Sequence, residues 1–220
     1  MITRTAIPAL LASATIFLTA CSTVRPIEQV RQSGDRHFKL EMYAAAADDY
    51  RELTERYPGD WVGHYQYGLC NLELGNYGEA RRSLRVALDR RPGEVKIEDA
   101  LAESMFRARD AESLYAFLRE RAESTQSASA YLRLARYAME MDDPDSAKVA
   151  IETAIVLDEG RTVDPYIAAA DLAERIGDRE GAVRRLCQAY GIDPKNTIVA
   201  DRLRAMGEIP GPTIAVAPGR

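Results

Sequence analysis

Small and large apolar residues recur in a fixed order along the chain. In the stretch YGEARRSLRVALDRRPGE, which begins at Tyr77, a small Ala80 is followed four residues later by Leu84 and three residues after that by a second alanine. Three further stretches keep the small residue and the large one four later; they begin at Tyr43, Pro144 and Arg179. Spacings of three and four residues place such side chains on one face of an α-helix. The pattern therefore predicts amphipathic helices.

These helices are predicted to come in pairs, with a period near 34 residues. Aligned copies begin near Ile27, Trp61, Val95, Ala128 and Val163, which gives offsets of 34, 34, 33 and 35. A fixed period of this length, built from two helices, indicates a solenoid of stacked helical hairpins. We expect an all-α fold over residues 27–194 with repeats at 27–60, 61–94, 95–127, 128–162 and 163–196, a capping helix at 197–206 and a flexible, Pro/Gly-rich tail at 207–220.

The repeated pattern resembles the tetratricopeptide repeat (TPR). Its eighth position is small in all five copies, as Gly34, Gly68, Ala102, Ala135 and Ala170, and its twentieth is small in four, as Ala46, Ala80, Ala147 and Ala182. Small residues at these two positions let the two helices of a hairpin cross closely. The resemblance implies about five TPR hairpins in a right-handed superhelical solenoid.

The third repeat departs from the pattern. It has Leu114 and Arg121 where small residues are expected, and Gln126 where other repeats have a helix-ending proline. Its length is nevertheless kept. The sequence therefore predicts a hairpin there but leaves the course of its second helix open.

The N-terminus has the features of a targeting segment. Arg4 precedes the apolar run AIPALLASATIFLTA, which is short for a transmembrane span, and this run leads into LTAC, where Cys21 follows Leu-Thr-Ala. This arrangement resembles the bacterial lipobox. It implies a lipoprotein signal peptide over residues 1–20, lipidation of Cys21 and a lipidated tether at 21–26. Because Ser22 follows the cysteine, the resemblance also implies the outer membrane, facing the periplasm. The alternative is a plain secretory signal with a chance cysteine.

Several function classes are not expected for this chain. A net charge of −5 with interspersed basic residues does not provide the basic face that nucleic acids require. His37 and His64 have no Cys or carboxylate at ligand spacing, so we expect no metal. The sequence contains no phosphate-binding loop and no nucleophile elbow, and we expect neither a cofactor nor an enzyme. Cys70 and Cys187 lie three repeats apart, which is too far for a disulfide.

A candidate protein-binding surface follows from the repeat register. In TPR solenoids the first helix of each repeat lines the inner curve, which implies the candidates Arg31, Phe38, Tyr65, Leu69, Leu72, Lys96, Phe106, Arg107, Leu132, Arg136 and Met139. The alternative for each residue is packing between hairpins. The family's carboxylate clamp for chaperone C-termini is not expected, because Asp35 would repel a carboxylate and Ala100 cannot bind one.

Together these features predict a membrane-anchored protein–protein interaction scaffold or assembly factor of the bacterial cell envelope. At the level of fold and anchor, the chain resembles the TPR lipoproteins of type IV pilus biogenesis, β-barrel assembly and cell-wall hydrolase adaptation. Its partners would be envelope proteins, whose identity the sequence does not give. The alternative is a small-molecule or glycan-binding lipoprotein, or an accessory subunit of a cell-wall hydrolase complex. A closed aromatic pocket would favour that alternative, whereas an open groove would favour the scaffold.

Overall fold

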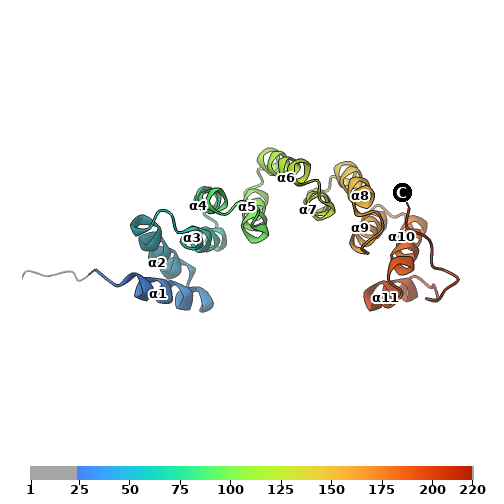
Figure 1. Cartoon of the computed structure of the whole chain (residues 1–220), viewed down its shortest axis with the longest axis horizontal. Helices are drawn as coiled ribbons and strands as arrows, with labels where there is room; N and C mark the ends of the chain where they lie inside the picture. The colour runs from blue at the N-terminus through green and yellow to red at the C-terminus, as the bar shows by residue number, and fades with distance from the viewer. Residues whose placement is uncertain (1–23, 220) are drawn as a thin grey trace, which may run out of the picture.

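The computed structural model describes residues 24–219, and these residues form eleven α-helices in sequential hairpins (Figure 1). The all-α solenoid of five hairpins and a capping helix is confirmed. The predicted signal peptide and Cys21 lie outside the described residues. The helices are α1 (Ile27–Lys39), α2 (Tyr43–Arg56), α3 (Trp61–Glu73), α4 (Tyr77–Arg90), α5 (Val95–Arg107), α6 (Ala111–Thr125), α7 (Ala128–Glu140), α8 (Pro144–Asp158), α9 (Asp164–Arg175), α10 (Arg179–Ile192) and α11 (Thr197–Ala205).

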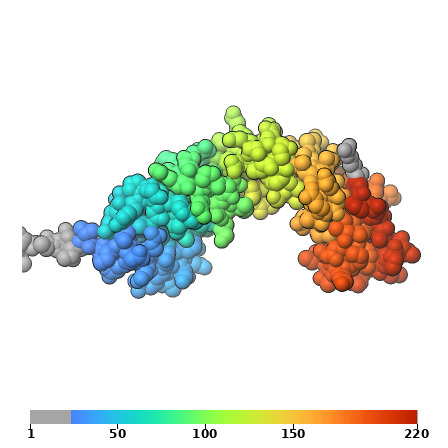
Figure 2. Space-filling view, in the orientation of Figure 1, coloured from blue at the N-terminus to red at the C-terminus, as the bar shows by residue number. Residues whose placement is uncertain are grey.

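The hairpins together form an arch. Figures 1 and 2 show α3, α5, α7 and α9 on the concave side of this arch and α4, α6 and α8 on its convex side. The first helices of the hairpins thus line the inner curve, as the register predicts. Within residues 24–219, no helix is both long enough and apolar enough to cross a bilayer.

Close crossings hold each hairpin together. Gly68 on α3 faces α4 so tightly that a Cβ atom added to it would lie 2.6 Å from Cγ of Leu84. Gly34 faces Tyr50 in the same way in the first hairpin, at 3.0 Å. On the facing helix, Ala80 is fully buried. The small residues of the repeat therefore set the distance between paired helices.

The tight turn inside every hairpin uses the left-handed backbone region. One residue of each turn lies in this region. Its φ is 57° for Glu41 and Arg109, 59° for Asp142, 76° for Gly75 and 81° for Gly177. Only two of the five hairpins have glycine there, although this region is unfavourable for other residues. The turn geometry therefore comes from the packing of the two helices and not from the turn residue alone.

The third hairpin is complete but more open than the others. Leu114 is fully buried at the position where other repeats have alanine, and α5 and α6 approach each other less closely than the helices of the other hairpins. Arg121 reaches the buried carboxylate of Glu98, with N and O atoms 2.6 Å apart, and Arg133 of α7 lies 3.1 Å from the same carboxylate. Two of the three departures from the repeat are thus explained: Leu114 separates α5 from α6, and Arg121 belongs to a buried ion cluster that joins α5, α6 and α7.

The C-terminal segment, which we expected to be flexible, lies against the solenoid. Residues 208–219, hereafter the strap, leave α11 and run along α10 (Figure 1). The backbone N–H of Val216 donates to the carbonyl of Cys187 at 3.2 Å, and Ile214 packs against the main core. The strap therefore belongs to the described fold.

Candidate protein-binding surface

Four apolar candidates lie on the helices that line the inner curve. Tyr65 and Leu69 come from α3, Phe106 from α5 and Met139 from α7, and all four are partly buried against the main core. The ring of Phe106 packs against that of Tyr137, with centroids 5.5 Å apart. These side chains are therefore anchored by the core while they keep part of their surface open.

Other predicted residues do not belong to this group of four. Leu72 is only 4% exposed and lies within the core, so its assignment to the binding surface is corrected to packing. Phe38 packs against a separate N-terminal cluster and meets the Tyr43 ring edge-on at 5.5 Å. Leu132 on α7 is partly buried.

Two of the four predicted cations are neutralised within the chain. Arg31 lies 2.6 Å from the Asp60 carboxylate. Arg107 lies 2.7 Å from Glu103 and 3.4 Å from Glu73. These arginines tie neighbouring turns and helices together, so they offer little free charge to a partner.

The other two predicted cations keep their charge available. Lys96 is exposed, and among residues 24–219 neither it nor Arg136 has a carboxylate within salt-bridge distance. The guanidinium of Arg136 stacks over the Tyr137 ring, 4.7 Å from its centroid. Arg136 and Met139 also line an open groove of ≈ 500 Å³ together with residues of α9. The inner surface thus combines apolar side chains with two unpaired cations, while Glu140, Asp171 and Glu174 line the same groove.

A polar chain fixes the relative positions of three inner helices. The Tyr137 hydroxyl of α7 donates to Glu103 of α5 at 3.2 Å, and Glu103 also binds Arg107, which reaches Glu73 of α3. A tyrosine phenol is a donor at neutral pH, and burial, with the nearby Glu103 charge, raises the pKa of Tyr137 further. This chain of contacts links α3, α5 and α7 across the inner surface.

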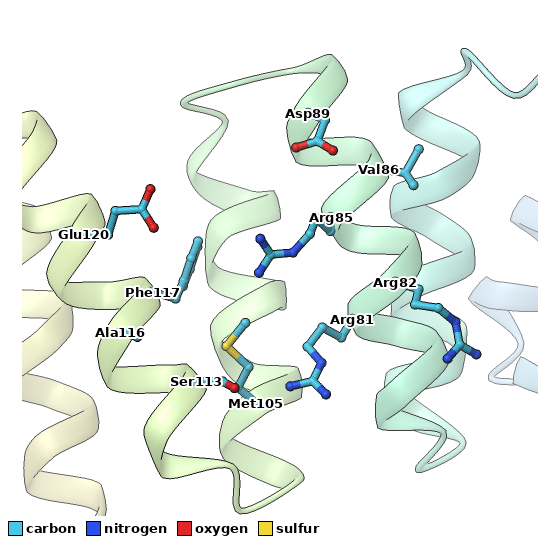
Figure 3. A pocket seen from close by; sticks show the side chains of 10 residues that line it. All are labelled: Arg81, Arg82, Arg85, Val86, Asp89, Met105, Ser113, Ala116, Phe117 and Glu120. Carbon is cyan, nitrogen blue, oxygen red and sulfur yellow. The ribbon is translucent and has the colours of Figure 1, made fainter.

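A second hollow lies on the convex side, between α4 and α6 (Figure 3). Its volume is ≈ 770 Å³, and Met105 and Phe117 contribute apolar surface. Arg85 points into it and makes no ion pair with any residue that the structure describes, whereas Asp89 and Glu120 add negative charge. The sequence interpretation missed this cleft because it considered only first helices. Its mixed charge selects neither an acidic nor a basic ligand.

Both histidines serve the packing of the N-terminal repeats. His64 contacts the Pro58 carbonyl at 3.2 Å, and His37 lies 2.8 Å from the buried Asp49, which also pairs with Arg25 at 2.9 Å. Burial opposes ionisation of Asp49, but hydrogen bonds from Ser33, Arg25 and His37 outweigh it and hold the pKa of this carboxyl below its usual value.

The described residues contain no evident metal centre, and their two cysteines are unpaired. No group of three or more His, Cys, Asp or Glu side chains in residues 24–219 is placed to hold a metal ion. Cys70 and Cys187 are free and buried. Burial raises the pKa of Cys70 to about 12, so its thiol is an inert core group.

Comparisons with known proteins agree with this architecture. Family models described as tetratricopeptide repeat match residues 31–95 and 128–160. A thermophilic TPR protein of Thermus thermophilus is 19% identical, with 82% of this chain and 98% of that chain covered and a TM-score of 0.51.

Two further solved structures are similar over most of the chain. MamA from Desulfovibrio magneticus RS-1 is 16% identical, with 77% and 96% of the two chains covered and a TM-score of 0.55. YrrB, described as a TPR protein with an unusual peptide-binding site, is 16% identical, with 78% and 88% covered and a TM-score of 0.50. At these identities the likeness shows the fold alone. Among curated proteins no sequence matches.

Proposed function

We propose that this chain, of which residues 31–95 and 128–160 match tetratricopeptide-repeat models, is a protein-binding scaffold, held at the bacterial cell envelope by a lipid on Cys21. The observation that carries the proposal is the inner surface of the arch. There Tyr65, Leu69 and Phe106 stay partly open on helices that a polar chain holds in place. Apolar and aromatic side chains on a rigid support are the usual anchors of protein interfaces.

The side chains of the inner surface indicate which chemical features a partner must have. A partner segment would bury apolar side chains against Tyr65, Leu69 and Met139. It would also bring carboxylates to Lys96 and Arg136, whose charges have no internal partner among the described residues. An extended peptide or an amphipathic helix can supply both features. The partner is thus a protein segment with apolar side chains and with carboxylates only at the positions that meet Lys96 and Arg136.

The shape of the molecule favours this function over the binding of a small molecule or glycan. Small-molecule sites are concave pockets that bury most of the ligand. Here the concave side of the arch is open along its length (Figure 2). Such a surface fits a long chain segment better than a compact ligand, and the proposal assigns no catalytic step to the protein.

The proposed anchor rests on the sequence. The apolar run before LTAC and the position of Cys21 support cleavage and lipidation at that cysteine. Multiple acyl chains bind a membrane far more firmly than one, because each buried methylene contributes about 0.8 kcal/mol. With Ser22 after the cysteine, the proposed location is the outer membrane on its periplasmic side.

A matched pair of tyrosine variants tests the binding surface. Tyr65→Ala removes a side chain of the inner surface, whereas Tyr57→Ala removes one that is 48% exposed at the end of α2. The parent and both variants would be used to capture proteins from an envelope extract, with crosslinking and mass spectrometry. We expect a protein that the parent and Tyr57→Ala retain and Tyr65→Ala loses. Equal capture by all three proteins would contradict the proposal.

A further inference from the structure

The chain enters the solenoid at the edge where the turns between successive hairpins lie. The first described residues, Val24 and Arg25, come shortly before α1 at one end of the arch (Figure 1). The Arg25 carbonyl accepts a hydrogen bond from Nη1 of Arg56 at 2.7 Å, and Arg56 is the last residue of α2. The beginning of the described chain is therefore held beside the turn that joins α2 to α3.

Two successive turns of this edge are built alike. The turn after α2 reads YPGD from Tyr57, and the turn after α4 reads RPGE from Arg91. A Cβ atom added to Gly59 or Gly93 in these turns would meet nothing within 4 Å. Both turns are therefore uncovered by the part of the chain that the structure describes.

Aromatic and apolar side chains surround these turns. Val24 is 72% exposed, Tyr57 is 48% exposed, and Val95, the first residue of α5, is 51% exposed. Trp61, the only tryptophan of the chain, begins α3 and is partly buried against the main core. The guanidinium of Arg91 lies over its ring, 5.7 Å from the centroid. The edge thus presents apolar and aromatic surface at the ends of packed helices.

The charges of this edge are nearly balanced. Among residues 24–219, neither Arg90 nor Arg91 has a carboxylate within salt-bridge distance. Three acidic residues of the same region are likewise outside any ion pair within the described chain: Glu55, Asp89 and Glu94. The edge therefore has no strong preference for a polyanion. Its binding chemistry is apolar and aromatic, with two arginines that can contact phosphate.

The proposed lipid on Cys21 brings a bilayer close to this edge. Cys21 precedes Arg25 by four residues, and four residues span at most about 14 Å. The opposite edge, at Met42, lies beyond the far end of α1, which has 13 residues and is therefore about 20 Å long. Of the two edges of the solenoid, the one with Tyr57 and Trp61 is thus nearer to the membrane surface.

We propose that this edge lies against the surface of the bilayer that holds the lipid of Cys21. The edge, hereafter the anchor edge, consists of Val24, Tyr57, Trp61, Arg90, Arg91 and Val95. The inference rests on the proposed lipid anchor and adds an orientation to it. Tryptophan and tyrosine rings favour the headgroup level of a bilayer. Because the anchor edge consists of helix ends, the helices extend away from the bilayer, and the inner curve stays open to a partner protein.

The fluorescence of Trp61 measures this contact, since the chain has no other tryptophan. The lipidated protein, purified from bacterial membranes, would be placed in vesicles of phosphatidylethanolamine and phosphatidylglycerol, part of them with brominated acyl chains. Bromine quenches tryptophan emission only at short range. We expect brominated lipid to quench Trp61, and we expect iodide in the water to quench it less in vesicles than in detergent.

Two double variants test which edge faces the lipid. Tyr57→Ser with Val95→Asp changes the anchor edge, and Leu40→Ser with Met42→Asp changes the opposite edge at residues that are 62% and 50% exposed. Each pair places serine just after a helix and aspartate at a helix N-terminus, where aspartate is well tolerated. We expect the first pair to lose most of the quenching by brominated lipid and the second to be quenched as the parent is. Circular dichroism checks the fold of both.

Failure of the anchor and failure of the edge give different results. If mass spectrometry finds Cys21 without lipid, both the anchor and the bilayer contact are wrong. If brominated lipid does not quench Trp61 in the lipidated parent, or if both folded double variants lose the quenching equally, the anchor stands and the contact is wrong. If iodide is excluded from Trp61 in vesicles although brominated lipid does not reach it, a protein covers this edge and the assignment to lipid is wrong.

Discussion

The variant Gly68→Ala tests the close crossing that defines each hairpin. Alanine in place of glycine normally stabilises a helix, by about 1 kcal/mol. At Gly68, however, the new methyl group would lie 2.6 Å from Cγ and 2.8 Å from Cδ2 of Leu84, which is itself fully buried. Neither side chain has free space to move into, so we expect the variant to be destabilised.

The change in the free energy of unfolding caused by Gly68→Ala is the sum of two opposing effects. Overpacking a closed core costs roughly 1–3 kcal/mol, and the gain in helix propensity offsets up to about 1 kcal/mol of it. The control is Gly78→Ala in the first turn of α4, where the added Cβ has no neighbour within 4 Å and the gain in helix propensity is smaller than in a helix interior. The two variants should therefore differ by up to about 3 kcal/mol in the free energy of unfolding, which is up to roughly 12 °C in Tm for a chain of this size.

Thermal and urea unfolding, both followed by circular dichroism, measure this difference. Urea midpoints should rank Gly78→Ala above Gly68→Ala, with the parent above Gly68→Ala. If Gly68→Ala were as stable as Gly78→Ala, the methyl group would have found room, and the crossing of α3 and α4 would be looser than the structure shows.

Three further predictions concern the anchor, the inner surface and the acid limit of stability. Cys21→Ala should yield an unprocessed precursor or a soluble form on membrane fractionation; normal processing with unchanged membrane association would refute the lipid anchor. Tyr65→Ala should weaken partner binding by at least about 1 kcal/mol, a roughly five-fold loss in a binding titration, without a change in circular dichroism. Asp49 has a lowered pKa in the folded protein, so its stabilisation is present above the usual carboxyl range and is lost as pH falls through the folded-state pKa. Asp49→Asn should thus flatten the fall in stability on acidification, and an unchanged profile would contradict this reasoning.

The repeat architecture could be predicted because its determinants are local. A hairpin crossing needs a small residue on each helix at a fixed spacing, and Gly68 and Ala80 show that spacing in the sequence itself. The same crossing, buried and tight, is present in the structure. Leu114 broke the pattern, and its effect could not be predicted. Whether a larger residue bends a helix, unfolds it or moves it outward depends on the neighbouring hairpins.

The strap could not be predicted because its contacts join distant parts of the chain. Composition around Pro210 and Gly211 is typical of a flexible tail. Its docking depends on Gly160 and Gly191, from two successive repeats, both lying against it. An unexplained glycine in the last turn of α10 was the one signal in the sequence.

The repeat register predicted which helices line the inner surface, but it did not predict which of their side chains are exposed or already paired. Leu69 and Leu72 lie three residues apart on α3, yet Leu69 is partly exposed and Leu72 is buried. The pairing of Glu73 with Arg107 had a signal, since these residues lie one repeat apart at the same position. Opposite charges at equivalent positions of adjacent repeats could have indicated that this arginine is already neutralised.

Site-specific photo-crosslinking tests the central claim, that the inner curve binds a partner protein, most directly. A photoreactive amino acid would replace Leu69 on the inner surface or, in a second protein, the exposed Arg82, which lines the hollow between α4 and α6 on the convex side. After irradiation in cells, we predict that a partner crosslinks to position 69 and that Tyr65→Ala in the same chain reduces this product. A partner that crosslinks to position 82 and not to position 69 would contradict the account.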